Sequence, residues 1–153
     1  MKEQKISRKK ERGLLLIAGI WQICNGLITM FMYAPTHRRE GLDLIDDSVT
    51  IVEAEAISQV FGSVYMFIVV FGMIYLIAGI LFVYLSRKMM DNKIVYIIPI
   101  VALITGLIAY FVMDIISVIF CLAAGVLALA KNKAVKELQV HGLMKREGYD
   151  NEK

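Results

Sequence analysis

The chain has 153 residues, of which 58% are hydrophobic and 20% are charged, and its formal net charge is +3. About half of a soluble domain is apolar, so this composition, with a mean hydropathy of +0.65, excludes an ordinary soluble protein. The charged residues are segregated into the segments between apolar runs, and this distribution does not indicate a nucleic-acid partner.

The first apolar run, Gly13 to Tyr33, follows a basic segment formed by residues 1–12. A secretory signal peptide has the same order of features, but this run is longer than a signal core. No small-x-small cleavage site closes the run before Ala34-Pro35. We therefore expect a retained membrane span over residues 13–33.

Polar side chains mark one face of this first expected span. Gln22, Asn25 and Thr29 are spaced by three and four residues, which puts them on one side of a helix. Their polar groups need partners in hydrocarbon, so this face should turn toward the bundle or another protein. Hydrogen bonding between helices is the ordinary role of such a face. A docking face for a partner helix, or the lining of a pathway, is the functional alternative.

The segment 34–59 is expected to be an outer loop, because it contains only two of the 17 lysines and arginines, and it is acidic. It could attract a divalent cation, but it lacks the alternating ligand spacing of a calcium loop, so we expect no metal site. Thr50 and Glu53 have the spacing of a capping box, which predicts that the second helix begins near Thr50. The second apolar run, Val60 to Leu85, then gives an expected span over 60–85.

The third and fourth apolar runs, Ile94 to Phe111 and Ile115 to Ala130, are separated by only three residues. A single helix over both would be about 55 Å long, far longer than the ~30 Å hydrocarbon core of a bilayer. We therefore expect a hairpin turn at Asp114, with Asp114 capping the fourth helix. Pro99 should release the carbonyl of Val95 and cause a modest kink.

Lysine and arginine in the flanking segments determine the expected orientation. Six precede the first span, two lie in 34–59, three lie in 86–93 and six follow Ala130. The positive-inside rule then puts both termini and the middle loop in the cytoplasm. Residues 131–153 form an expected cytoplasmic amphipathic tail, in which Lys131 to Glu147 should be a short surface helix on anionic lipid.

A small-residue motif recurs in every expected span. Variants of one pentapeptide contain Gly19, Gly79, Gly106 and Gly125. Small residues allow helix backbones to approach closely in lipid. We expect Gly19, Gly79 and Gly125 to form one layer near the inner side, with Gly106 nearer the bilayer middle. Packing within the bundle is the favoured use of these glycines, and a homo-oligomer face is the alternative.

The opening Ser7-Arg8-Lys9-Lys10-Glu11-Arg12-Gly13-Leu14 runs directly into a glycine-containing span, and later helices also carry glycine. In these features the chain resembles small four-span membrane proteins of Gram-positive bacteria that are grouped as domains of unknown function. The resemblance implies a bacterial plasma membrane and transfers no catalytic residue.

The expected fold class is all-α, an integral membrane four-helix bundle with spans at about 13–33, 60–85, 94–111 and 115–130 and both termini cytoplasmic. No Ser-His-Asp, zinc or phosphate-loop spacing occurs, so we expect no enzymatic activity, catalytic residue, metal or cofactor. The hypothesis is an accessory protein that binds a larger membrane partner in assembly, regulation or immunity. The alternative is a small homo-oligomeric transporter or pore lined by the polar face of the first helix.

Overall fold

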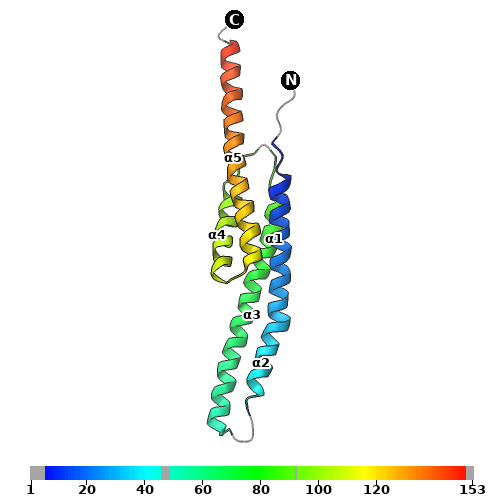
Figure 1. Cartoon of the computed structure of the whole chain (residues 1–153), viewed down its shortest axis with the longest axis vertical. Coiled ribbons are helices and arrows are strands. Elements are labelled where there is room, and N and C mark those ends of the chain that lie inside the picture. The colour runs from blue at the N-terminus through cyan, green and yellow to red at the C-terminus, as the bar shows by residue number, and fades with distance from the viewer. Residues whose placement is uncertain (1–5, 46–48, 92, 151–153) are drawn as a thin grey trace. The chain divides into compact units, whose positions relative to one another are not determined.

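The computed structural model describes residues 6–45, 49–91 and 93–150, with backbone alone for 141–150. Small parts of the expected N-terminal segment, outer loop, middle loop and tail lie outside these residues. The described chain is helical and contains no strand, which confirms the all-α class. The elements in chain order (Figure 1) are α1 (Lys9–Ile28), a π-helical turn η1 (Thr29–Tyr33), α2 (Ala34–Leu42), α3 (Ile51–Lys88), α4 (Ile97–Phe111) and α5 (Ile115–Asp150).

Three helical stretches are long and apolar enough to cross a bilayer, namely Lys9–Leu42, Ile51–Lys88 and Ile115–Val140. The remaining helix, α4, is apolar but has only 15 residues. Its length of about 22 Å is less than the ~30 Å hydrocarbon core. The described fold therefore combines three membrane-length helices with a shorter fourth.

The chain divides into two compact units, and both α1 and α3 contribute to each. The first unit contains the chain up to Ala18 and from Phe82 onward, and the second contains residues 19–81. The core of the first unit combines α1, the end of α3, α4 and α5 and consists of Leu15, Ala18, Phe82, Met89, Ile98, Ala102, Cys121, Ala124 and Ala128.

Helices α4 and α5 of the first unit form a hairpin and pack along each other (Figure 1). Small residues lie at their contact. A Cβ atom added to Gly106 would lie 3.2 Å from Cys121 Cβ, and one added to Gly125 would lie 2.7 Å from Leu103 Cγ. The two helices can therefore approach this closely because glycine occupies both positions.

The turn between α4 and α5 occupies residues 112–114. Met113 has φ of 60°, the left-handed region that L residues seldom adopt. Asp114 Oδ1 accepts the backbone N–H of Ser117 at 3.1 Å, and the Ser117 hydroxyl donates to Asp114 Oδ2. Asp114 thus satisfies a free amide in the first turn of α5 and acts as its N-cap.

Helix α5 continues without a break past Ala130 to Asp150. A short surface helix over 131–147, distinct from the fourth span, is what the sequence predicts here. Between Lys131 and Val140 no glycine or proline interrupts the chain, and most residues there favour a helix. The described part of the tail is therefore an extension of α5.

The second unit contains a helical segment where the sequence analysis expected the start of a loop. The N–H of Ala34 donates to the carbonyl of Thr29, five residues earlier, which is π-helical bonding. Pro35 follows in the first turn of α2, where a missing N–H is tolerated. Of the expected loop 34–59, residues 43–45 and 49–50 are therefore not helical, and residues 46–48 lie outside the described residues.

The start of α3 has the predicted capping box. The N–H of Thr50 donates to Glu53 Oε2 at 3.0 Å, and the N–H of Glu53 donates to Thr50 Oγ1 at 3.5 Å. The two side chains thus satisfy each other's backbone amides. The capping-box prediction is confirmed, and α3 begins at Ile51.

Candidate functional site

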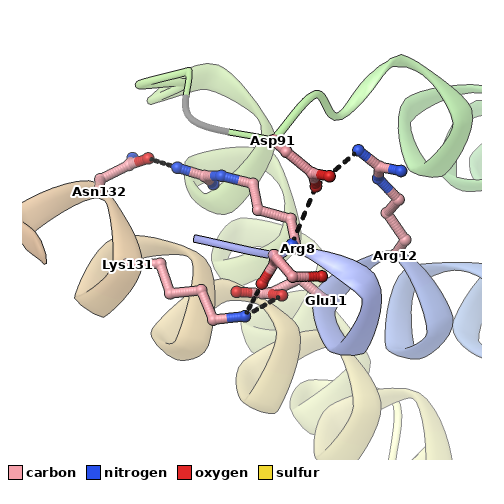
Figure 2. Close-up of polar contacts among 7 residues, drawn as sticks. Arg8, Glu11, Arg12, Asp91, Lys131 and Asn132 are labelled. Atoms are coloured by element: carbon pink, nitrogen blue, oxygen red, sulfur yellow. Dashed lines mark hydrogen bonds and ion pairs between the residues drawn. The ribbon is translucent and has the colours of Figure 1, made fainter. Parts of the chain in front are cut away.

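A cluster of polar side chains lies in the first unit where the start of α1, the α3–α4 connection and α5 meet (Figure 2). We call it the polar network. Its members are Arg8, Glu11, Arg12, Ser86, Asp91, Lys131 and Asn132. Arg8 and Glu11 are 0% exposed, and Ser86 and Asn132 are also buried. Charged side chains are seldom buried so completely unless they are paired.

The periodicity of α1 explains why charged residues enter the interior. Arg8, Glu11, Leu15 and Ala18 are spaced by three or four residues and therefore lie on one helical face. All four are buried. The apolar face of α1 is thus continued by two charged residues at its beginning.

Asp91, from the connection between α3 and α4, lies against the N-terminus of α1. Its Oδ1 accepts the backbone N–H of Arg8 at 3.0 Å and the Nη2 of Arg12, also at 3.0 Å. A carboxylate at a helix N-terminus is favoured by the free amides and the helix dipole. The hydroxyl of Ser86 donates to the carbonyl of Arg12 at 2.8 Å, which also attaches the end of α3 to α1.

Asn132 of α5 holds the segment that precedes α4. Its Oδ1 accepts the N–H of Val95 at 3.2 Å, and its Nδ2 donates to the Val95 carbonyl at 2.7 Å. The same Oδ1 accepts Nη2 of Arg8. Pro99 has no N–H to donate to the Val95 carbonyl, so the amide of Asn132 takes that place. These bonds hold residues 94–96 outside the helix, so α4 starts three residues later than the expected span 94–111.

Glu11 and Lys131 form the second pair of opposite charges in the network. Lys131 Nζ lies 2.8 Å from Glu11 Oε2 and also donates to the carbonyl of Ser7 at 2.6 Å. This pair joins α1 to α5 next to the Arg8–Asn132 contact, because Lys131 and Asn132 are consecutive residues of α5 (Figure 2). Because Glu11 is fully buried, its carboxylate depends on this partner for compensation.

The charges within the polar network nearly balance. The three cationic side chains of Arg8, Arg12 and Lys131 lie beside the two carboxylates of Glu11 and Asp91. Burial lowers the pKa of Arg8 below its usual value, and the nearby carboxylates of Glu11 and Asp91 partly offset this shift. An arginine stays protonated under these conditions. Within the polar network, the buried side-chain atoms that lack a hydrogen-bond partner are Nε and Nη1 of Arg8, Nε of Arg12 and Oε1 of Glu11. The opposite charges of the polar network therefore pair with each other and connect α1 to the α3–α4 connection and to α5. The charged groups of Arg8 and Glu11 are buried from solvent.

Of the polar residues predicted on the first span, Gln22 and Asn25 lie on α1, and Thr29 begins η1. Gln22 is buried and its Oε1 has no hydrogen-bond partner, whereas Asn25 and Thr29 are half-buried. The Thr29 hydroxyl donates to the carbonyl of Asn25 at 2.7 Å, within its own helix. Gln22 is therefore the member of this face whose polar group is enclosed and incompletely bonded.

Two of the predicted glycines meet in the second unit. A Cβ atom added to Gly79 would lie 2.6 Å from the carbonyl oxygen of Gly19. A second pair, Gly26 and Gly72, lies seven residues from the first pair on each helix and is not predicted from the sequence. A Cβ atom added to Gly26 would lie 2.7 Å from the carbonyl oxygen of Gly72. We call these two pairs the glycine seam. Gly106 and Gly125 belong to the first unit and pack between α4 and α5.

Large apolar side chains are exposed where α2 ends and α3 begins. We call this group the apolar tip, and its members are Leu42, Leu44, Ile51 and Val52. Ile51 is 87% exposed and Val52 is 78% exposed. Exposed carboxylates surround these residues in the sequence, at Glu40, Asp43, Glu53 and Glu55. Exposed apolar clusters with polar rims are typical of interaction surfaces.

The polar network is not among the sites predicted from the sequence, because from the sequence alone its basic residues are interpreted as signals of orientation and of lipid binding. The periodicity of the buried face could have identified Arg8 and Glu11, which precede Leu15 by seven and four residues. Asn132 likewise continues the buried face of α5 formed by Cys121, Ala124 and Ala128. Among the described residues, no group of three or more His, Cys, Asp or Glu side chains could hold a metal ion.

Comparisons with protein-family models, with curated proteins and with solved structures found no match. In the part of the chain that the structure describes, the fold and the composition of the helices define an all-helical protein with three helices suited to crossing a membrane. Within that class, the polar network, the glycine seam and the apolar tip are the features that bear on function.

Proposed function

We propose that the chain is a bacterial plasma-membrane protein that crosses the bilayer four times with both termini in the cytoplasm. It acts as a non-enzymatic accessory protein that binds a larger membrane partner. The segregation of lysine and arginine supports the orientation, and the three membrane-length helices support insertion in a bilayer.

The depth of the α4–α5 hairpin supports the fourth span. Asp114 precedes Asn132 by eighteen residues on α5, a rise of about 27 Å. This rise approaches the ~30 Å of the hydrocarbon core, and a small local thinning of the bilayer accommodates the difference. The turn at Asp114 then reaches one surface while the polar network lies at the other.

The observation that carries the partner-binding proposal is the apolar tip. In the proposed topology the segment 34–59 is outside the membrane, so lipid does not cover Leu44, Ile51 and Val52. Exposure of such large apolar side chains to water is unfavourable by about 25 cal/mol per Å². A partner with an apolar patch and basic residues at its rim would cover the tip and match its carboxylates.

Affinity purification in a mild detergent tests this function. The wild-type chain should recover a second membrane protein, and the triple variant Leu44→Ser, Ile51→Ser, Val52→Ser should lose it. The matched control is Leu138→Ser with Val140→Ser, which changes exposed apolar residues of α5 and should retain the partner. Recovery of the chain alone under conditions that preserve other complexes would contradict the proposal, as would full retention by the triple variant.

A second candidate function follows from the enclosed and incompletely bonded Gln22. A homo-oligomeric transporter or pore could line its pathway with Gln22, Asn25 and Thr29, where Gln22 Oε1 would bond to solute or water. Purified protein in liposomes should then pass an ion or small solute, and Gln22→Leu with Asn25→Leu should reduce the flux. Flux equal to that of empty liposomes would eliminate this candidate.

A further inference from the structure

The first unit carries a set of exposed basic residues around the polar network. We call it the basic collar, and its members are Lys9, Lys10, Arg87, Lys88, Lys93, Lys133 and Lys136. They come from α1, α3, the α3–α4 connection and α5. We propose that the basic collar binds the phosphate-bearing headgroups of anionic phospholipids.

The polar network already engages two of the carboxylates that lie near the collar in the sequence. Glu11 is paired with Lys131, and Asp91 is bonded to Arg8 and Arg12. Within the described side chains of the first unit, Glu137 is the one exposed carboxylate. Seven exposed cations thus face one exposed anion, and the positive potential of this surface attracts an anionic partner.

The side chains next to the collar identify that partner as lipid. Lys88 Nζ lies 5.8 Å from the ring centroid of Tyr84, which is itself exposed. Tyr96 and Ile97 are exposed four residues or fewer after Lys93. Cations, tyrosine rings and aliphatic side chains within about one helical turn match the boundary between headgroups and acyl chains. A soluble acidic protein or a nucleic acid offers no apolar layer at that position.

The exposed arginines of the second unit have a different setting. Arg38 and Arg39 are accompanied by the exposed carboxylates Glu40 and Asp43, and the Arg38 guanidinium lies 5.4 Å from the ring centroid of Tyr65. Neighbouring carboxylates reduce the attraction of these arginines for an anionic headgroup. The two arginines therefore provide a matched control for the collar.

The expected effect is large enough to measure. Each basic residue near an anionic surface strengthens binding about five-fold at low salt. Neutralising four collar residues should therefore weaken the preference for anionic lipid by at least about ten-fold, even after partial compensation by the others. Lipid binding by the collar requires a chain embedded in a bilayer, but it requires neither the proposed partner nor the proposed orientation. A negative result for lipid binding would therefore leave the partner-binding proposal and the orientation untouched.

The test uses the full chain in nanodiscs of phosphatidylcholine with a minor fraction of phosphatidylglycerol. After release into mild detergent, native mass spectrometry measures the phosphatidylglycerol that remains bound. The wild type should retain it in excess of its share of the bilayer. The variant Lys9→Gln, Lys10→Gln, Arg87→Gln, Lys88→Gln should lose this enrichment, while Arg38→Gln with Arg39→Gln should keep it. Circular dichroism checks that each variant remains helical.

Two measurements on the wild type keep the test independent of any folding defect. Enrichment should fall steeply when the salt concentration is raised, because bound headgroups are screened. An acidic peptide or a short oligonucleotide should not displace the lipid. Equal enrichment in the four-glutamine variant, equal loss in the Arg38/Arg39 control, salt-independent enrichment or displacement by a soluble polyanion would each overturn the proposal.

Discussion

Asn132 bonds to three groups from two other segments, namely the guanidinium of Arg8 and both backbone groups of Val95. A buried amide of this kind contributes little net free energy while all its bonds are formed. Its loss is costly, because the groups it served stay buried without partners.

We therefore expect Asn132→Leu to destabilise the chain. Each group left unsatisfied costs about 1–3 kcal/mol, so the melting temperature in detergent should fall by several degrees. The control is Gln139→Leu, which changes an exposed side chain on the same helix and should shift the melting temperature little. Fluorescence of the single tryptophan, Trp21, reports the transition. Equal melting temperatures for Asn132→Leu and wild type would show that the network does not stabilise the fold.

Met113 provides a second prediction at this scale. Its φ of 60° costs a residue with a side chain about 1–2 kcal/mol. Met113→Gly should relieve this cost and raise the stability by about 1 kcal/mol or less, because glycine also loses more entropy on folding. Met113→Val should lower it, because a branched side chain tolerates this conformation poorly. Thermal unfolding of the two variants checks the opposite signs; a lower melting temperature for the glycine variant would contradict the strained turn.

At the scale of elements, the glycine seam determines how closely α1 and α3 approach within the second unit. The two glycine pairs are seven residues apart on each helix, so they recur on the same side of both helices. Backbone contact of this kind stabilises helix association in lipid, where no hydrophobic drive operates between helices.

Gly79→Ala should weaken this helix pair, because the new methyl group would lie 2.6 Å from the carbonyl oxygen of Gly19. The control is Gly62→Ala in the same helix, where an added Cβ meets nothing within 4 Å. Alanine favours a helix over glycine by about 1 kcal/mol, so the control should be neutral or stabilising. Thermal unfolding compares the two variants, and an equal or higher stability for Gly79→Ala would contradict the seam.

The sequence predicted most helices and the hairpin turn, because long apolar runs and a capping aspartate are local signals. It did not predict α2, since a proline such as Pro35 usually indicates a break and the π-helical turn before it has no clear local signature. It also did not predict the burial of Arg8 and Glu11. That burial depends on Asp91, Lys131 and Asn132, which lie 80 to 124 residues away in the chain.

At the scale of the whole molecule, the two units carry exposed charges of opposite kinds. The first unit presents the basic collar, and the second presents the acidic residues that surround the apolar tip. Lysine and arginine, on which the positive-inside rule depends, are concentrated in the first unit, and this distribution supports the cytoplasmic side of the proposed topology. In this topology the apolar tip lies outside the membrane, as the partner-binding proposal requires, whereas lipid binding by the basic collar requires only that the chain is embedded in a bilayer.

Labelling of single cysteines in intact cells tests this topology most directly. In a background with Cys24→Ala and Cys121→Ala, Met113→Cys places a thiol at the exposed α4–α5 turn, and Lys10→Cys places one at the start of α1. A membrane-impermeant maleimide should label Met113→Cys and should reach Lys10→Cys only after the cells are lysed. Protection of Met113→Cys, or labelling of Lys10→Cys in intact cells, would contradict four spans with a cytoplasmic N-terminus.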